Sequence, residues 1–479
     1  MLNKMRRNAA VRKLTDFFYS PYYIATIGLV VIICYTLGWD TLCYGILAVG
    51  VSAALLFCDD ATPVIPALSV FPFIKSMRWR LEAESFRNAA NIVPMVLFGV
   101  LAGGAFVFHF IVHGGYKRFF TWGRMGIAML ALALGMTVSG FFSGSYSFVF
   151  RGETVQLAYS FSYMLNALQI ALPLCGLYFV LRPVIRWNKN SITYLACAFM
   201  TAGIILSVQV AECYLLYKPF IESNFTAKDL MVAGWGISNN IGAAIFHCIP
   251  LTLYLACKEK KHAWFFVLAA TVMFVCMAFT FCRSSLLFGT PLFLAGLAIA
   301  CVKGNCRKQI WACVVVIAAM GVAVLCWSKT KELFGFYFGH GMDDSGRFPI
   351  YRLGFELFGK FPVFGVGLWD YKFYDISHYF HNTPIQFMAA GGFVGLGTYA
   401  FYRVAVVRLY GRKLSFDRVF LGLSVAAIVL ISLLDNGFMR MYSHPFTVLL
   451  LLFSERDLER SVWFADCPKL GKRKALFAA

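Results

Sequence analysis

Three of the chain's eight histidines occur in one polar stretch of the sequence, residues 328–383: His340, His378 and His381. A histidine has an ordinary pKa close to neutral pH, so its imidazole can take a proton from an attacking hydroxyl group. The same stretch contains Arg347 and Arg352. Arginine binds phosphate oxygens through two parallel hydrogen bonds and keeps its charge in a low-dielectric environment. These residue types favour chemistry on a substrate that carries phosphate.

A further arginine, Arg283, directly precedes the apolar segment 285–302. We expect it to bind phosphate as well, although a long cationic side chain beside an apolar segment can also simply reach the membrane surface. The same alternative holds for Arg347. For Arg352 the alternative is an ion pair with Glu356, one helical turn later.

A helix that positions these two arginines is predicted for residues 345–361. Pro349 suits its first turn, and Pro362 ends it. Aromatic residues recur at helical spacing on one face: Phe348, Tyr351, Phe355 and Phe358. An amphipathic helix beside a membrane lies along its surface, so this helix would hold Arg347 and Arg352 at the depth of the lipid headgroups.

The rest of the sequence is too apolar for a water-soluble fold. Of 479 residues, 60% are hydrophobic and 14% are charged, and the mean hydropathy is +0.71. Soluble domains are about half apolar and about a quarter charged. Lipid is therefore the solvent for much of the surface, and lipid confines a chain to helices or a closed barrel. Apolar stretches of helical length, without alternation, predict an all-α polytopic membrane protein in which residues 1–479 form a single membrane domain.

The apolar stretches predict roughly 12–14 transmembrane helices. They lie near residues 22–37, 41–58, 90–112, 122–143, 155–181, 191–217, 231–257, 264–282, 285–302, 309–327, 384–407, 417–434 and 438–453. Ala61–Ile74 is the segment in doubt, because it is short and contains Pro63, Pro66 and Pro72. It either adds a crossing or re-enters the membrane from one side.

Basic loops between the stretches set the predicted orientation. They are residues 114–124, 182–190, 258–262, 303–308 and 408–418. Cytoplasmic loops carry an excess of Lys and Arg, so these loops place both termini in the cytoplasm. Residues 328–383 then form one large extracytoplasmic loop that contains the amphipathic helix.

Net charge and cysteines exclude other classes of partner. The formal net charge of +20 follows largely from the cytoplasmic loops, and no basic soluble domain is present, so nucleic acid is not an expected partner. The cysteines lie mostly inside apolar stretches and lack metal-ligand spacing, so we expect neither a metal nor a disulfide framework. Glu212 is an acid within a predicted span and is therefore a functional candidate, without a specific role.

The histidine lies in a pattern that resembles the O-antigen ligase and polymerase family. His381-Asn382, nine residues and then Gly392-Phe393-Val394-Gly395 match that family's H-[NSQ], nine residues, G-x-x-[GTY]. Upstream, two further elements are similar to those of the family. Gly346-Arg347 is similar to its GR element, and residues 361–367 (FPVFGVG) are similar to its P-x-x-G-x-G element. Arg283 is similar to an arginine that precedes the family's next span. Gly234-Trp235 and Asn239-Asn240 resemble another outer segment, so the resemblance covers residues 230–400.

The resemblance implies a metal-independent, inverting glycosyltransferase without a cofactor, in the inner (cytoplasmic) membrane. The donor would be an oligosaccharide on a polyprenyl (undecaprenyl) diphosphate, and the acceptor would be a hydroxyl of a glycan or glycolipid. The reaction would polymerise or ligate a cell-surface polysaccharide such as O-antigen, capsule or exopolysaccharide. His381 would be the catalytic base, while Arg283, Arg347, Arg352 and Asn382 would bind substrate.

Two alternatives remain at this point. A flippase or transporter of the lipid-linked oligosaccharide would carry internal repeats and broken helices near the middle of the membrane. A peptidoglycan-polymerising membrane enzyme would need an acidic catalytic residue in its large loop, for which Asp343, Asp344, Asp370 and Asp375 are available. The polar residues gather in one outer loop around a histidine, which favours the glycosyltransferase.

Overall fold

The computed structural model describes most of the chain. The described residues are 8–75, 89–119, 122–142, 146–150, 152–157, 161–186, 190–223, 230–231, 233–236, 238–325, 347–367, 380–411, 414–435, 438 and 441–466. Most of the predicted outer loop 328–383 lies outside them, including His340, His378 and Gly346.

The described part of the chain is helical apart from one short β-hairpin, which confirms the all-α polytopic membrane class. Nine described helices are long and apolar enough to cross a membrane, and ten if the bent pair α2 (Ala9–Phe18) and α3 (Pro21–Thr36) is one span. The nine are α4 (Asp40–Phe57), α6 (Ala89–Val112), α8 (Arg124–Phe141), α9 with α10 (Ser162–Ala171 and Leu177–Leu181), α11 (Ser191–Leu215), α13 (Ser238–Lys258), α15 (Arg283–Lys303), α19 (Thr383–Tyr410) and α20 (Phe416–Leu434).

This count is lower than the expected 12–14. Three further predicted spans coincide with helices: α14 (Ala263–Phe279), α16 (Arg307–Leu325) and α21 (His444–Asp466). However, α14 has only 17 residues, and the second half of α21 carries several charged residues.

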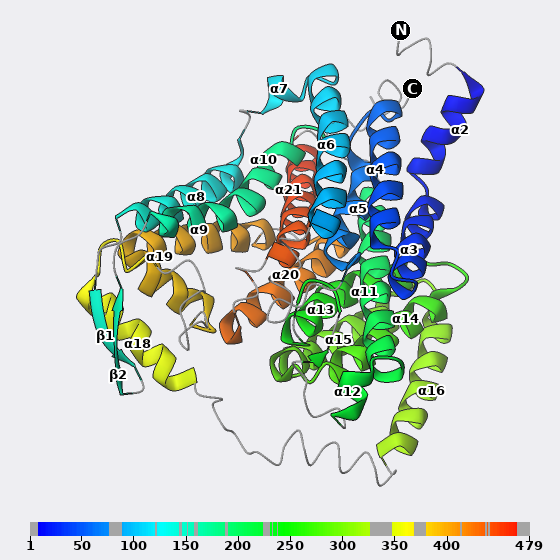
Figure 1. Cartoon of the computed structure of the whole chain (residues 1–479). Helices are drawn as coiled ribbons and strands as arrows, with labels where there is room; N and C mark the ends of the chain where they lie inside the picture. The colour runs from blue at the N-terminus through cyan, green and yellow to red at the C-terminus, as the bar shows by residue number, and fades with distance from the viewer. Residues whose placement is uncertain are drawn as a thin grey trace.

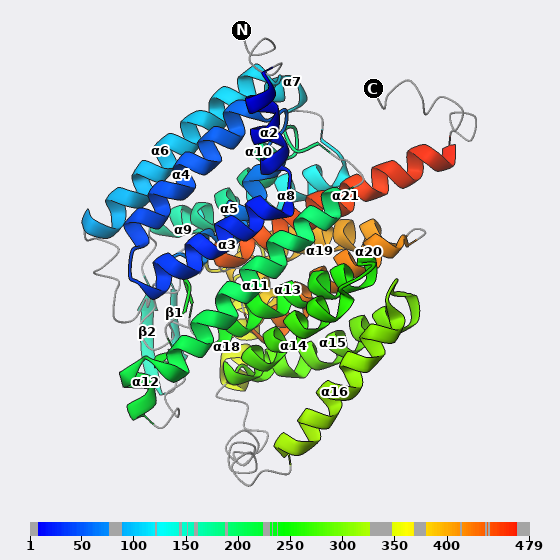
Figure 2. The same cartoon turned by 90° about the vertical axis from the view of Figure 1, so that its right-hand side faces the viewer.

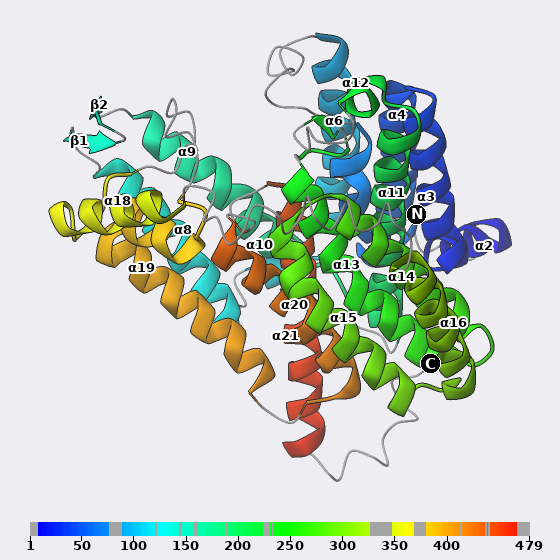
Figure 3. The ribbon, with the colours of Figure 1, turned by 90° about the horizontal axis from the view of Figure 1, so that it is seen from below.

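The helices form two groups that meet at α20 and α21 (Figures 1 and 3). One group contains α8, α9, α19 and α18 (Arg347–Lys360), with the hairpin at its edge. The other contains α3, α4, α6, α11 and α13 to α16, and Figure 2 shows α3 and α11 lying along each other in it. Helix α13 is the centre of this second group. It is buried along almost its whole length, and it packs against α11, α14, α15 and α20.

The hairpin was not predicted. Strands β1 (Tyr146–Phe150) and β2 (Glu153–Leu157) pair in antiparallel register, with Phe148 opposite Val155. The turn uses Gly152, whose φ of 86° a residue with a side chain rarely adopts. The span predicted at 155–181 therefore begins only at Ser162.

The segment in doubt, Ala61–Ile74, is three short pieces: η1 (Thr62–Val64), α5 (Ile65–Val70) and η2 (Phe71–Phe73). A proline stands in the first turn of each piece, where it suits a helix start and prevents a longer helix from running through. The segment is largely buried, and Gln209 of α11 donates to the carbonyl of Phe73 at 2.6 Å. The segment is too short to cross a bilayer, which agrees with the alternative that it re-enters the membrane from one side.

Buried ion pairs fasten one end of the helices. Arg418 at the start of α20 is fully buried, and its guanidinium lies 2.7 Å from the carboxylate of Asp457 in α21. Arg182 after α10 lies 3.1 Å from Glu455. Removing one partner of a buried pair costs about 3–5 kcal/mol, so these contacts fix α10, α20 and α21 to one another.

Helix α19 bends sharply at Gly392, whose φ of 57° and ψ of −151° are not helical. On a straight helix, Phe387 and Tyr399 would be separated by roughly 18 Å along the axis. Their ring centroids instead lie 4.5 Å apart. The span predicted at 384–407 is therefore two helical arms, 383–391 and 393–410, which diverge from the bend in Figure 1.

Residues 362–367 supply backbone hydrogen bonds on both sides of this bend. Two amides of the segment donate to carbonyls before Gly392, and two amides after Gly392 donate to carbonyls of the segment. The pairs are Val366–Ala389 (3.0 Å), Gly367–Ala390 (2.9 Å), Phe393–Pro362 (2.7 Å) and Val394–Val363 (3.2 Å). The glycines allow this approach: a Cβ on Gly392 would lie 2.5 Å from the carbonyl oxygen of Pro362, and one on Gly365 would overlap the backbone of Ala390.

Replacing Gly392 by alanine is therefore expected to destabilise the protein. A positive φ costs a residue with a side chain about 1–3 kcal/mol, and the new Cβ would also push residues 362–367 away. Gly397→Ala is the matched control, because a Cβ there would meet nothing within 4 Å. The midpoint of thermal unfolding in detergent should fall for Gly392→Ala and not for Gly397→Ala. Equal midpoints would contradict the importance of the bend.

Candidate functional site

His381 lies directly before α19 and has a left-handed backbone, with a φ of 47°. Residues with side chains rarely adopt this conformation, and it occurs preferentially at functional sites. Asn382 holds the turn from both sides. Its side-chain oxygen accepts a hydrogen bond from the Ile385 amide at 3.0 Å, and its side-chain nitrogen donates to the Leu433 carbonyl at 2.9 Å. Both ends of the Asn382 amide are thus engaged in capping α19 and joining it to α20.

The imidazole of His381 lies beside the carboxylate of Asp435, the residue that ends α20. The His381 Nδ1 and the Asp435 Oδ1 are 3.5 Å apart, and the two side chains are 20% and 8% exposed. A carboxylate next to Nδ1 favours the tautomer with its proton on that nitrogen, so Nε2 can accept a proton from a substrate. The arrangement is a base oriented by an acid.

The start of α15 lies near the same carboxylate. Asp435 acts electrostatically on the buried thiol of Cys282, and α15 packs along α20. Gly242 allows α13 to pack closely against the same end of α15, because a Cβ there would lie 2.8 Å from the Cβ of Cys282. Arg283 is the first residue of α15 and is exposed. The fold therefore brings the end of the helix that carries Arg283 close to His381 and Asp435.

Helix α18 reaches the histidine from another side. The hydroxyl of Tyr351 donates to the His381 carbonyl at 3.4 Å. Gly354 lies against the first turn of α19, since a Cβ on it would be 2.5 Å from the Cγ2 of Ile385. Arg347 is one helical turn before Tyr351, on the same face of α18, and is half-exposed. Its position on this face places it on the histidine's side of the helix.

The predicted helix at 345–361 is present as α18 (Arg347–Lys360), and the face that packs inside the protein is not its aromatic one. The residues that are buried are Ile350, Leu353, Gly354 and Leu357, whereas Phe348 is 70% and Phe355 is 57% exposed. The small Gly354 permits the close approach of the aliphatic face to α19, while Tyr351 and Phe358 at its border are half-buried. Arg352 forms the alternative ion pair with Glu356 at 3.0 Å, and its side chain is 83% exposed.

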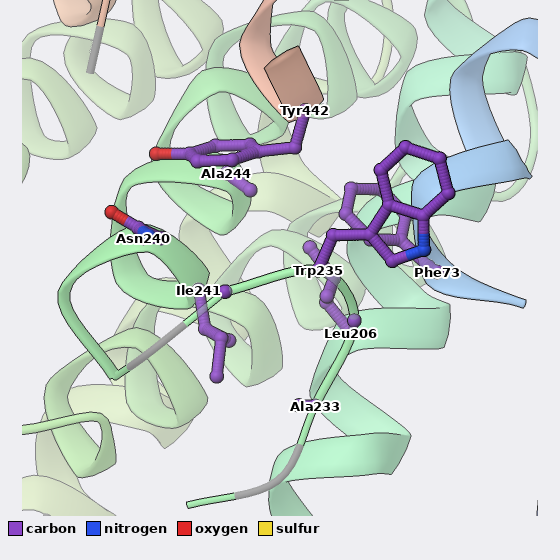
Figure 4. A pocket seen from close by; sticks show the side chains of 10 residues that line it. Phe73, Leu206, Ala233, Trp235, Asn240, Ile241, Ala244 and Tyr442 are labelled. Carbon is purple, nitrogen blue, oxygen red and sulfur yellow. The ribbon is translucent and has the colours of Figure 1, made fainter. Parts of the chain in front are cut away.

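A small pocket lies between residues 233–236 and the start of α13 (Figure 4). Its volume of about 10 Å³ is at the lower limit for one water molecule. Trp235 and Asn240, from the predicted outer segment, line it together with Phe73 and Tyr442. Gln209, which binds the Phe73 carbonyl, also accepts from the Gly234 amide at 3.0 Å. One buried side chain thus shapes the wall of the pocket.

Glu212, the intramembrane acid singled out in the sequence, has ordinary surroundings. Glu212 accepts a hydrogen bond from the Thr36 hydroxyl at the end of α3. Within the part of the chain that the structure describes, no three His, Cys, Asp or Glu side chains form a group that could hold a metal ion. The expectation of a reaction without a metal or cofactor stays a prediction.

Residues 268–400 match the family described as O-antigen ligase. The matched range includes Arg283, helix α18, residues 362–367 and the bent α19 that follows His381. Residues 268–400 form an O-antigen ligase domain. The predicted resemblance is therefore confirmed, and the general activity of this multi-pass membrane protein is glycosyl transfer of the O-antigen ligase type, between a lipid-linked oligosaccharide and a glycan acceptor. No curated protein matches the chain.

The sequence reasoning missed Asp435, which lies outside the O-antigen ligase domain. In the sequence this aspartate follows directly on the apolar stretch 417–434. An acid that directly adjoins an apolar span is a candidate functional residue, so its position was an available signal. The sequence could not show that Asp435 lies beside His381, because these two residues are far apart in the chain.

Proposed function

We propose that the O-antigen ligase domain transfers an oligosaccharide from a polyprenyl (undecaprenyl) diphosphate to a sugar hydroxyl, without a metal and with inversion at the anomeric carbon. The contact between His381 and Asp435 carries this proposal. It provides an oriented base at the start of a helix, with Tyr351 of the arginine-bearing α18 hydrogen-bonded to the same residue.

The reaction uses each of these groups. The His381 Nε2 takes the proton of the acceptor hydroxyl, and Asp435 stabilises the imidazolium that forms. The acceptor oxygen attacks the anomeric carbon from the face opposite the diphosphate. The bond from that carbon to the diphosphate oxygen breaks, and the electron pair leaves with the diphosphate. Attack from the opposite face inverts the configuration at the anomeric carbon.

Arg283 and Arg347 would bind the diphosphate. Each stands at the first residue of its helix, where the backbone amides and the helix dipole also favour an anion. Because negative charge grows on the leaving group, contacts from these arginines strengthen in the transition state and accelerate the reaction. Arg352 is the weaker candidate because Glu356 already pairs with it. Asn382 has mainly a structural role in this proposal, because its side chain caps α19 and donates to the Leu433 carbonyl.

The proposed orientation places the site outside the cytoplasmic membrane and both termini inside. In support, three of the predicted cytoplasmic segments lie together: Lys258 pairs with Asp417 at 2.8 Å, and Asn305 donates to the Lys258 carbonyl at 2.9 Å. Asp417 is in the first turn of α20, whereas Asp435 beside His381 follows the last residue of that helix, so the basic segments and the proposed site lie at opposite ends of α20.

The first expected outcome tests this orientation. A thiol reagent that cannot cross membranes should react in intact cells with Arg347→Cys and not with Asn305→Cys. Labelling of the native protein gives the background from its own cysteines. Labelling of residue 305 alone would place the site on the cytoplasmic side and contradict the proposal.

The second expected outcome concerns His381 as the catalytic base. A positioned base contributes about 10²–10⁴-fold, so His381→Ala should lower turnover by that factor with little change in donor binding. The assay uses purified protein in nanodiscs, a polyprenyl-diphosphate oligosaccharide and either a glycolipid core or a second repeat unit as acceptor. Asn382→Ala is the comparison and should lose about 1 kcal/mol of stability through its cap. Wild-type turnover by folded His381→Ala would remove the histidine from the mechanism.

The third expected outcome concerns Arg283 and Arg347 as ligands of the diphosphate. Lysine keeps the charge but lacks the planar fork, so Arg283→Lys and Arg347→Lys should lose nearly as much activity as the alanine variants. Arg352→Lys should have a small effect, because that side chain pairs with Glu356. Near-normal transfer by both Arg283→Lys and Arg347→Lys would rule out bidentate binding of the diphosphate.

A further inference from the structure

Arg403 in the second arm of α19 is a cation inside a predicted membrane span. Its guanidinium carbon lies 4.8 Å from the ring centroid of Tyr399, 5.6 Å from that of Tyr402 and 5.5 Å from that of Phe438. Its Nε donates to the Tyr399 hydroxyl at 2.7 Å. Its Nη2 is buried and has no hydrogen-bond acceptor among the described residues. Aromatic faces, rather than a carboxylate, therefore stabilise this charge.

The bend at Gly392 brings Arg403 toward the site. If α19 were straight, Arg403 would lie roughly 33 Å from His381 along the axis. In the bent helix, Phe387 of the first arm stacks on Tyr399 at 4.5 Å and lies 6.2 Å from Phe438. Arg403 thus packs against an aromatic cluster to which both arms contribute.

Phe438 links this cluster to the catalytic acid. It follows Asp435 by three positions, so at most roughly 11 Å of chain separates them. Its side chain is fully buried, and its carbonyl lies 3.2 Å from the Nε2 of His444. Arg403 and His444 therefore fix Phe438 through its ring and its backbone respectively.

We propose that Arg403 is a positioning residue for glycosyl transfer: by holding Phe438 it fixes the chain that carries Asp435 against His381. The inference rests on the proposed function, since it acts through the His381–Asp435 contact. In this proposal Arg403 acts through Phe438 and not by contact with a substrate. The planar guanidinium is suited to this role because it stacks on several rings at once, which the ammonium of lysine cannot do.

The test is a double-mutant cycle in the nanodisc transfer assay. Arg403→Met and Phe438→Leu should each lower kcat by about tenfold, with the donor KM within about twofold of the native value. Arg403→Met should cause no further loss in an Asp435→Asn background, because the contact that it supports is already gone. Arg408→Met is the matched control: this arginine is exposed on the same arm, and its variant should be fully active.

Three outcomes would overturn the inference. Losses from Arg403→Met and Asp435→Asn that multiply would show a general effect on folding. A fully active Arg403→Lys beside an impaired Arg403→Met would show that charge alone matters, as for binding an anionic lipid. Native kcat in Arg403→Met would show no role. His381→Ala separates the two proposals: if it retains native turnover, the proposed function fails as well, whereas a low turnover leaves the proposed function standing.

Discussion

The backbone hydrogen bonds between residues 362–367 and the two arms of α19 are the interaction on which the site depends. In lipid, a helix that breaks leaves amides and carbonyls without water, and each such group is costly. The break at Gly392 persists because the segment 362–367 bonds to carbonyls before it and amides after it. That segment directly follows α18, so the same bonds draw α18 against the start of α19. Tyr351 thereby reaches the carbonyl of His381.

The site is an assembly of helix ends. The N-terminal ends of α15 and α19 lie near Asp435, which directly follows α20, and α18 adds a third N-terminus. Helix N-termini present unpaired amides and a positive dipole end, which suit a diphosphate. Asp435 at the C-terminal end of α20 suits the cation that would form on His381 in the proposed reaction. The opposite charges needed for acid–base chemistry and phosphate binding thus come from elements that run in opposite directions.

Stability and chemistry use charge differently in this fold. At the far end of α20, Arg418 and Asp457 are buried and 2.7 Å apart, a contact that holds helices together. Near the site, Arg283 is exposed and Arg347 is half-exposed. A buried pair is satisfied within the protein, whereas an exposed guanidinium keeps its hydrogen-bond donors available to a ligand.

The sequence by itself determined the fold class and the position of most helices, and it predicted the residue types of the proposed site. Long apolar runs such as 191–217 specify spanning helices because lipid permits little else, and His381-Asn382 with the downstream glycines indicated the family. The bend in 384–407, the packed face of α18 and the partnership of Asp435 with His381 depended on the tertiary structure. An apolar run has the same composition whether the helix is straight or broken, and only contact with 362–367 decides between them. Asn382 illustrates the difference: its type suits a substrate ligand, but the neighbouring carbonyl of Leu433 and amide of Ile385 engage both ends of its side chain.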